Sequence, residues 1–142
     1  MAFTRKASAV WNGSLKEGKG SLSSASGALK NIPYSFHNRF ENEPGTNPEE
    51  LIAAAHAGCF AMAFSADLGK AGFTPDSIET TAAVTLDFPE GVPTVTKSEL
   101  TMKAKIPGIS QEEFTKIAAG AKAGCPISRL LKAEISLEAT LL

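Results

Sequence analysis

A long alanine-rich segment between residues 47 and 71 constrains the fold of this chain more than any other feature. Asn47 is a favoured helix N-cap and Pro48 suits the first helical position, so we predict a helix over Asn47–Ala71. At ~1.5 Å per residue this helix is roughly 36 Å long. Small residues lie almost all round it: Ala53, Ala54, Ala55, Ala57, Gly58, Ala61, Ala63 and Ala66. A helix that is apolar on every side is buried, either under its own sheet or against a second copy, and the sequence leaves both open.

The rest of the pattern predicts strands on both sides of this helix. Before the long helix the pattern predicts short strands. After it, alternating apolar residues predict two strands, followed by two further helices and a final strand. The predicted early segments are 6–11, 20–23, 28–32 and an extended stretch over 34–40. The predicted later segments are strands 78–88, 100–106 and 135–141, and helices 110–123 and 126–131. This order predicts an α+β fold rather than repeated βαβ units.

Size and charge narrow the class of protein. At 142 residues we expect a single domain over 1–142. The formal net charge of −1 predicts no attraction to nucleic acid or to an anionic membrane. The apolar run 51–66 includes His56 and is shorter than the ~20 residues of a membrane span, and the first residues hold no signal-peptide core. We therefore expect a cytoplasmic protein, in which a disulfide is more often transient than structural.

Two cysteines, 66 residues apart, are the sulfur nucleophiles of the chain. Cys59 lies in the middle of the long helix, where the helix dipole stabilises a thiolate only slightly. Among alanines its pKa is expected to be raised and the thiol inert, unless a cation approaches it. Arg39 is the leading candidate for that cation, because a guanidinium stays charged and can donate to both a thiolate and a substrate oxygen.

Cys125 stands between Gly124 and Pro126, where one helix ends and the next begins. At such an N-cap it faces the free N–H groups of Ile127 and Ser128, which lowers a thiol pKa. Local electrostatics therefore select Cys125 as the more acidic thiol. Two inert core cysteines and one thiol–disulfide couple both remain open at this point.

Ligands for zinc and a carboxylate partner for Arg39 are two further candidate features of the sequence. His56 and Cys59 are three residues apart and Cys125 could join them, but no CxxC pair or fourth ligand accompanies them. We expect no metal, and we expect His56 to be a helix-surface or packing residue. Glu49 and Glu50 are helix starters, and either could hold Arg39. Glu49 precedes Cys59 by ten residues, ~15 Å along a helix, so it could act only through the arginine or on an antiparallel second copy.

Five motifs carry a resemblance that spans most of the chain. They are Arg39-Phe40-Glu41, Gly45-Thr46-Asn47-Pro48-Glu49-Glu50-Leu51, Ala54-Ala55-His56-Ala57-Gly58-Cys59-Phe60, Ala71-Gly72-Phe73-Thr74-Pro75 and Lys122-Ala123-Gly124-Cys125-Pro126-Ile127-Ser128. In this the sequence resembles the Ohr/OsmC family of thiol-dependent peroxidases, and its OsmC branch most. The resemblance implies two three-stranded sheet halves around a long central helix, in an intertwined homodimer. It also implies reduction of organic hydroperoxides in preference to hydrogen peroxide.

By position, the resemblance makes Cys59 the peroxidatic and Cys125 the resolving cysteine, against the local electrostatic argument. Arg39 and Glu49 match the arginine and glutamate of the OsmC branch. The Ohr branch takes its arginine from nearer the N-terminus, a region where this chain has Lys16 and Lys19.

The implied cycle runs through a Cys59 sulfenic acid and a Cys59–Cys125 disulfide that a dithiol, suggested by the resemblance to belong to a lipoylated protein, reduces. It needs no cofactor. A second hypothesis is a non-enzymatic stress-response protein that binds a small ligand and keeps its cysteines in the core. Residues that could line an apolar pocket, with core packing expected for most, are Phe40, Phe60, Met62, Phe64 and those near Ile127.

Overall fold

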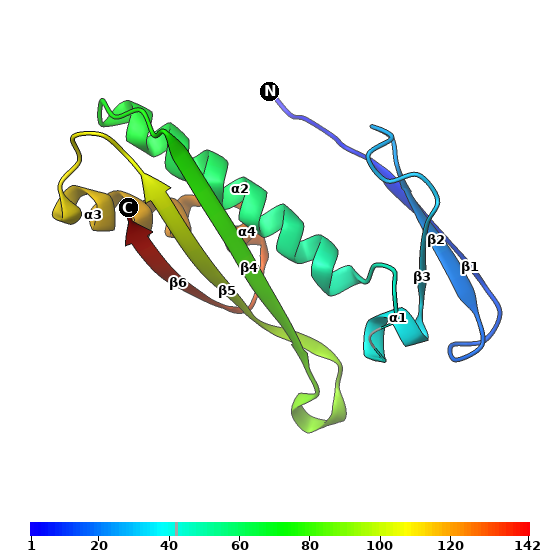
Figure 1. The fold of residues 1–142 in the computed structure, drawn as a ribbon. Helices are drawn as coiled ribbons and strands as arrows, with labels where there is room; N and C mark the ends of the chain where they lie inside the picture. Colours follow the sequence, from blue (N-terminus) through cyan, green and yellow to red (C-terminus); the bar gives the residue numbers. More distant parts are fainter. Residues whose placement is uncertain (42) are drawn as a thin grey trace. The chain divides into compact units, whose positions relative to one another are not determined.

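The computed structural model describes residues 1–41 and 43–142, and these form two compact units, 1–51 and 52–142. Each unit is described by itself, and the single domain predicted over 1–142 stays a prediction. The first unit holds an antiparallel sheet in the order β1-β2-β3, followed by the short helix α1 (Figure 1). Their bounds are β1 Ala7–Asn12, β2 Lys19–Ser24, β3 Ile32–Ser35 and α1 Phe36–Phe40.

A glycine in the middle strand lets two aromatic rings meet over the first sheet. Trp11 of β1 and Tyr34 of β3 are the register partners of Gly20 on either side. Their ring centroids lie 5.3 Å apart. A Cβ built on Gly20 would lie 2.4 Å from Cε1 of Tyr34, so the rings can close over this strand only because the side chain is missing.

Two predictions in this unit were wrong. The third strand does not cover 28–32 but begins at Ile32 and continues through Pro33, which pairs only with β2 and so needs no second ladder bond. The extended stretch predicted over 34–40 ends at Ser35. The Ser35 hydroxyl accepts the backbone N–H of Asn38 and caps α1, a local hydrogen bond that alternation of residue types does not reveal.

The long helix α2 spans Pro48–Lys70, in agreement with the prediction. The Glu50 N–H donates to Oδ1 of Asn47 at 2.8 Å, which is the expected N-cap. At the other end Gly72 adopts a φ of +87°, and the Phe73 N–H donates to the carbonyl of Leu68. This Schellman closure satisfies the last carbonyls and ends the helix.

The second unit holds a sheet in the order β4-β5-β6, with β5 antiparallel to β4 and parallel to β6 (Figure 1). A 3-10 turn, η1 (Pro89–Gly91), joins β4 to β5, and two helices lie in the chain between β5 and β6. The bounds are β4 Ser77–Asp87, β5 Thr94–Lys105, α3 Gln111–Gly124, α4 Pro126–Leu130 and β6 Glu134–Leu141. The α+β class with two three-stranded sheets and a long helix is confirmed.

One face of β5 meets the helices in the core of this unit. Alternate β5 side chains are buried, and so is a stripe of α2 residues spaced four apart. The buried residues of β5 are Ser98, Leu100, Met102 and Ala104; those of α2 are His56, Phe60, Phe64 and Leu68; those of α3 are Phe114, Ala118 and Ala121. In the described part of the chain these four α2 side chains are the fully buried residues of that helix, and Met62 on another side of the helix is 77% exposed.

By length and composition α2 is a helix that could cross a bilayer, and it is longer than the apolar run recognised in the sequence. The core helix of a globular domain meets the same two criteria. The stripe of α2 that packs on β5, with the polar His56 inside it, fits a core helix.

Candidate active site

Cys125 occupies the turn that joins α3 to α4. Its N–H closes α3 by donating to Ala121, and its carbonyl accepts the N–H of Arg129 in α4. Pro126 begins α4, and the φ of −56° and ψ of 125° at Cys125 redirect the chain between the two helices. The side chain is fully buried. A helix stop followed at once by a helix start thus fixes this thiol in the core.

Cys59 comes to the same place from α2. It is a free thiol that is only partly buried and packs against the core cluster that contains Cys125. A side-chain hydrogen bond between the two thiols perturbs the pKa of each. The structure therefore brings together the two cysteines that the sequence separates by 66 residues.

The two thiols differ in acidity. Burial raises the pKa of Cys59 and the neighbouring Cys125 adds to this, while the N–H of Ile127 opposes it. Burial also acts to raise the pKa of Cys125, but the Ser128 N–H, the Cys59 thiol, the Ile127 N–H and the Ser128 hydroxyl outweigh it, and the net shift is downward. Within one chain Cys125 is the more acidic thiol, as the helix-start argument predicted.

The two thiols also differ in access, in the opposite sense. Cys59 is partly exposed, whereas the exposed fraction of Cys125 is 0%. Exposure of the whole residue therefore favours Cys59 over Cys125 for contact with a molecule in solution. Within the second unit no positive charge stabilises a thiolate at Cys59, the more exposed residue. Cys125, whose pKa is lowered, is fully buried.

Arg39 and Glu49 form a bidentate ion pair in the first unit. Nη2 of Arg39 lies 2.6 Å from Oε1 of Glu49, and Nε lies 3.2 and 3.1 Å from Oε1 and Oε2. The side chains are 34% and 14% exposed. The pairing predicted for one of two glutamates is thus made by Glu49, while Glu50 lies 3.5 Å from the Thr46 hydroxyl. Such a fork fixes the plane of the guanidinium.

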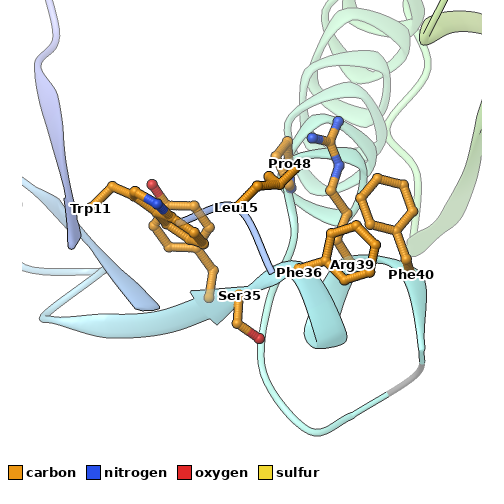
Figure 2. Close-up of a pocket in the computed structure, with 8 residues that line it drawn as sticks. Trp11, Leu15, Ser35, Phe36, Arg39, Phe40 and Pro48 are labelled. Carbon is orange, nitrogen blue, oxygen red and sulfur yellow. The ribbon is translucent and has the colours of Figure 1, made fainter. Parts of the chain in front are cut away.

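An apolar cavity of about 300 Å³ adjoins Arg39 in the same unit. Figure 2 shows the side chains around it, with the Arg39 guanidinium beside the ring of Phe40. Its lining residues are Trp11, Leu15, Tyr34, Ser35, Phe36, Arg39, Phe40 and Pro48. Arg39 is the charged member of this set, and its Cζ lies 5.3 Å from the centroid of the Phe40 ring. Such a cavity suits an apolar molecule with one polar end.

Of the residues predicted to line a pocket, Phe40 lies at this cavity. Phe60 and Phe64 are fully buried core residues, the role expected for most of the set. Met62 is exposed and lines no part of the cavity.

His56 is the residue whose surroundings the sequence did not reveal. It is fully buried, with Nδ1 2.6 Å from Oγ of Ser98 and Nε2 2.8 Å from Oγ of Ser128. Burial lowers the pKa of the imidazole. Both ring nitrogens are thus engaged by serines. Within residues 1–41 and 43–142 no cluster of His, Cys, Asp or Glu side chains could hold a metal ion.

Fold and site together define a class: an α+β protein with two mutually perturbing thiols, one on a long helix and one at a helix–helix turn. Over residues 40–140 the sequence matches the family described as OsmC-like protein. It is 53% identical over 138 residues to Peroxiredoxin OsmC of Escherichia coli, covering 97% of this chain and 96% of the relative. The chain belongs to the OsmC family.

More distant relatives match this chain in sequence or in fold. Organic hydroperoxide resistance protein-like 1 of Staphylococcus saprophyticus is 36% identical over 98 residues, 68% of each chain. The crystal structure of organic hydroperoxide resistance protein OhrB of Bacillus subtilis aligns with a TM-score of 0.70 at 24% identity, covering 99% and 98% of the two chains. The OsmC-like protein of Mycoplasma pneumoniae aligns with a TM-score of 0.77 at 15% identity over 100% and 99%.

Proposed function

We propose that this protein is a thiol-dependent peroxidase that reduces organic hydroperoxides to alcohols and acts more weakly on hydrogen peroxide. The observation that carries the proposal is the meeting of a reachable thiol, Cys59, with a buried and more acidic one, Cys125. A relative that is 53% identical bears the name of a peroxiredoxin, and this supports the same chemistry.

In the first step Cys59 attacks the peroxide. Its thiolate bonds to the terminal oxygen, the O–O bond breaks, and the alkoxide takes a proton and leaves as an alcohol, so that Cys59 becomes a sulfenic acid. Access favours Cys59 for this role, because the nucleophile must touch the substrate and Cys125 is fully buried. Acidity alone would favour the other thiol.

Ionising Cys59 requires a positive charge, because burial raises its pKa. Arg39 supplies that charge in our proposal, and Glu49 holds its guanidinium in one plane. The N–H groups that Glu49 does not engage, on Nη1 and on the outer side of Nη2, can donate to the thiolate and to the peroxide oxygen at once. The apolar cavity beside Arg39 would then hold the organic group, which gives the preference over hydrogen peroxide.

The proposal includes a homodimer in which two α2 helices pack together, the intertwined arrangement that the family resemblance implies. One stripe of α2 is covered in a single chain, and the exposed side carries alanines and Met62. A second copy would bury that side and could carry an Arg39–Glu49 pair to a Cys59. Sedimentation at several protein concentrations tests the dimer.

In the second half of the cycle Cys125 closes a disulfide with Cys59, and an external dithiol reopens it. A lipoylated protein is our candidate for that dithiol. The cytoplasm, where thiols are kept reduced, is the compartment that suits this cycle. Cell fractionation tests the location, and turnover with a free or a protein-bound lipoyl dithiol tests the reductant.

The deciding experiment is consumption of cumene hydroperoxide under dithiol turnover. The wild type should consume it, Cys59→Ser should not, and Cys125→Ser should complete a single turnover and stall. Equal consumption by wild type and Cys59→Ser would instead favour the small-ligand binding protein with core cysteines.

A further inference from the structure

His56 is a buried ionisable side chain that has no role in the peroxidase cycle proposed above. Its exposed fraction is 0%, and it lies on α2 one turn before Cys59. Its two hydrogen bonds reach residues that are far away in the sequence, Ser98 on β5 and Ser128 on α4. A buried polar network that is fully satisfied fixes the orientation of each member.

The tautomer of His56 decides where the Ser128 proton points. A neutral imidazole donates through one nitrogen and accepts at the other. If the Ser98 hydroxyl donates to Nδ1, then Nε2–H donates to Oγ of Ser128, and the single Ser128 proton is free for another acceptor. In the other tautomer Ser128 spends its proton on Nε2. The Ser128 hydroxyl therefore accepts from Nε2 in the first tautomer and donates to Nε2 in the second.

Cys125 is the candidate acceptor for that proton. Ser128 is the third residue of α4, three positions after Cys125, and helical side chains lean toward the N-terminus of their helix. The lowered pKa of Cys125 fits a Ser128 hydroxyl that donates to the sulfur, because such a bond stabilises the thiolate. A Ser128 proton aimed at the sulfur requires the tautomer in which Nε2 of His56 carries the proton.

We propose that His56 is a positioning residue for the resolving thiol: acting through Ser128, it keeps a hydroxyl proton aimed at the sulfur of Cys125. The proposal rests on the peroxidase function above and deepens it. In this proposal the His56–Ser98–Ser128 network sets how fast the disulfide closes. It also sets which sulfur of the disulfide the reductant attacks.

The network acts at two steps of the cycle. In closure the Cys125 thiolate attacks the sulfur of the Cys59 sulfenic acid; the S–S bond forms, the S–O bond breaks, and the hydroxide takes a proton and leaves as water. In reduction a dithiol thiolate attacks Cys59, and Cys125 leaves as the thiolate. The second thiol of the dithiol then attacks the reductant sulfur that is bonded to Cys59. This releases Cys59 and closes the disulfide of the reductant. A more acidic thiol is the faster leaving group, so attack at Cys59 is favoured.

Other charges near the network do not compete with this effect. In the part of the chain that the structure describes, Cys59 is the titratable side chain that perturbs Cys125, and burial alone shifts the pKa of His56. Lys97 and Glu99, the neighbours of Ser98 on β5, are exposed, and so is Arg129 on α4. Because burial lowers its pKa, His56 stays neutral at neutral pH.

The test follows one turnover of the reduced protein in a stopped-flow instrument, with sulfenic acid and disulfide measured separately. His56→Leu and Ser128→Ala should each slow disulfide closure by about tenfold, the effect of one lost hydrogen bond to a charged group. The double variant should be no slower than either single variant, because both act on one path. His56→Gln, whose amide can still donate to Ser128, should restore most of the rate. Ser136→Ala, an exposed serine on β6, is the matched control.

A second measurement does not depend on peroxide chemistry. In a Cys59→Ser background the ultraviolet absorbance of the thiolate reports Cys125 alone, and adding Ser128→Ala should move its titration up by about one pH unit. Absence of oxidation in the wild type would defeat the proposed function while this titration still decides the role of Ser128. Wild-type closure rates in His56→Leu and Ser128→Ala with an unmoved titration would overturn the inference. If His56→Leu does not fold, His56→Gln and Ser128→Ala carry the test.

Discussion

Two neighbouring side chains of α2 allow its two faces to be tested separately. Phe64 is fully buried, with ring centroids 6.2 Å from Phe60 and 5.7 Å from Phe114, the latter edge to face. Truncating a buried phenylalanine costs about 3–5 kcal/mol. Aromatic pairs add ~0.5–1.5 kcal/mol each beyond burial, which places Phe64→Ala in the upper half of that range. Its melting temperature should fall by roughly 10 °C or more.

Met62 is the matched control, two residues away and 77% exposed. In a lone chain Met62→Ala should change the free energy of unfolding by no more than about 0.5 kcal/mol. In the proposed dimer, where the second copy covers this side of α2, the cost should rise toward ~1.5–3 kcal/mol per fully covered side chain. The midpoint of unfolding should then also depend on protein concentration.

Urea unfolding of both variants at two protein concentrations, monitored by circular dichroism, measures these quantities. A loss below about 1 kcal/mol for Phe64→Ala would contradict the packing of α2 on β5, because no fully buried ring of this size is that cheap to remove. A harmless Met62→Ala together with a concentration-independent midpoint would refute the dimer and leave the core intact.

Three further predictions concern the site and the first sheet. In Arg39→Ala the rate of Cys59 oxidation should rise about tenfold per pH unit through neutral pH, because the raised pKa leaves the thiol protonated below it; a flat profile in stopped-flow oxidation would show that another cation acts. Arg39→Lys keeps the charge but loses the fork to Glu49, so turnover of cumene hydroperoxide should still fall several-fold, and wild-type turnover would refute the positioning role. Gly20→Ala should cost about 1–3 kcal/mol in urea unfolding, because its Cβ would lie 2.4 Å from Tyr34, whereas Gly27→Ala, open in space but with a positive φ, is the control for backbone strain alone.

Local signals predicted α2 and most of the second unit, although β5 begins at Thr94, six residues before the predicted 100–106. The Asn47-Pro48 start of α2 and the capping box of Ser110 and Glu113 at α3 are hydrogen bonds between residues three apart, which a sequence displays directly. The alternation in β5 and β6 was confirmed, because one face of β5 is buried and one face of β6 is partly buried. The strand expected over 28–32 begins only at Ile32, and the stretch expected over 34–40 ends at Ser35, whose hydroxyl caps α1.

The candidate site was predictable only in part. The acidity of Cys125 follows from Pro126 beside it, and the Arg39–Glu49 pair follows from two charges near the start of α2. The difference in access between the two thiols is a tertiary property and has no sequence signal. The same holds for His56, whose partners lie 42 and 72 residues away.

The turn between α3 and α4 also sets how the molecule changes when it is oxidised. A bond from Cys125 to Cys59 would tie this turn to α2 and enclose β4, β5 and α3 in one covalent ring. Restricting the unfolded chain in this way stabilises the folded state by roughly 4 kcal/mol for a ring of this length. The reduced protein is then the looser and more easily digested form, and resistance to a protease should rise and fall with each turn of the cycle.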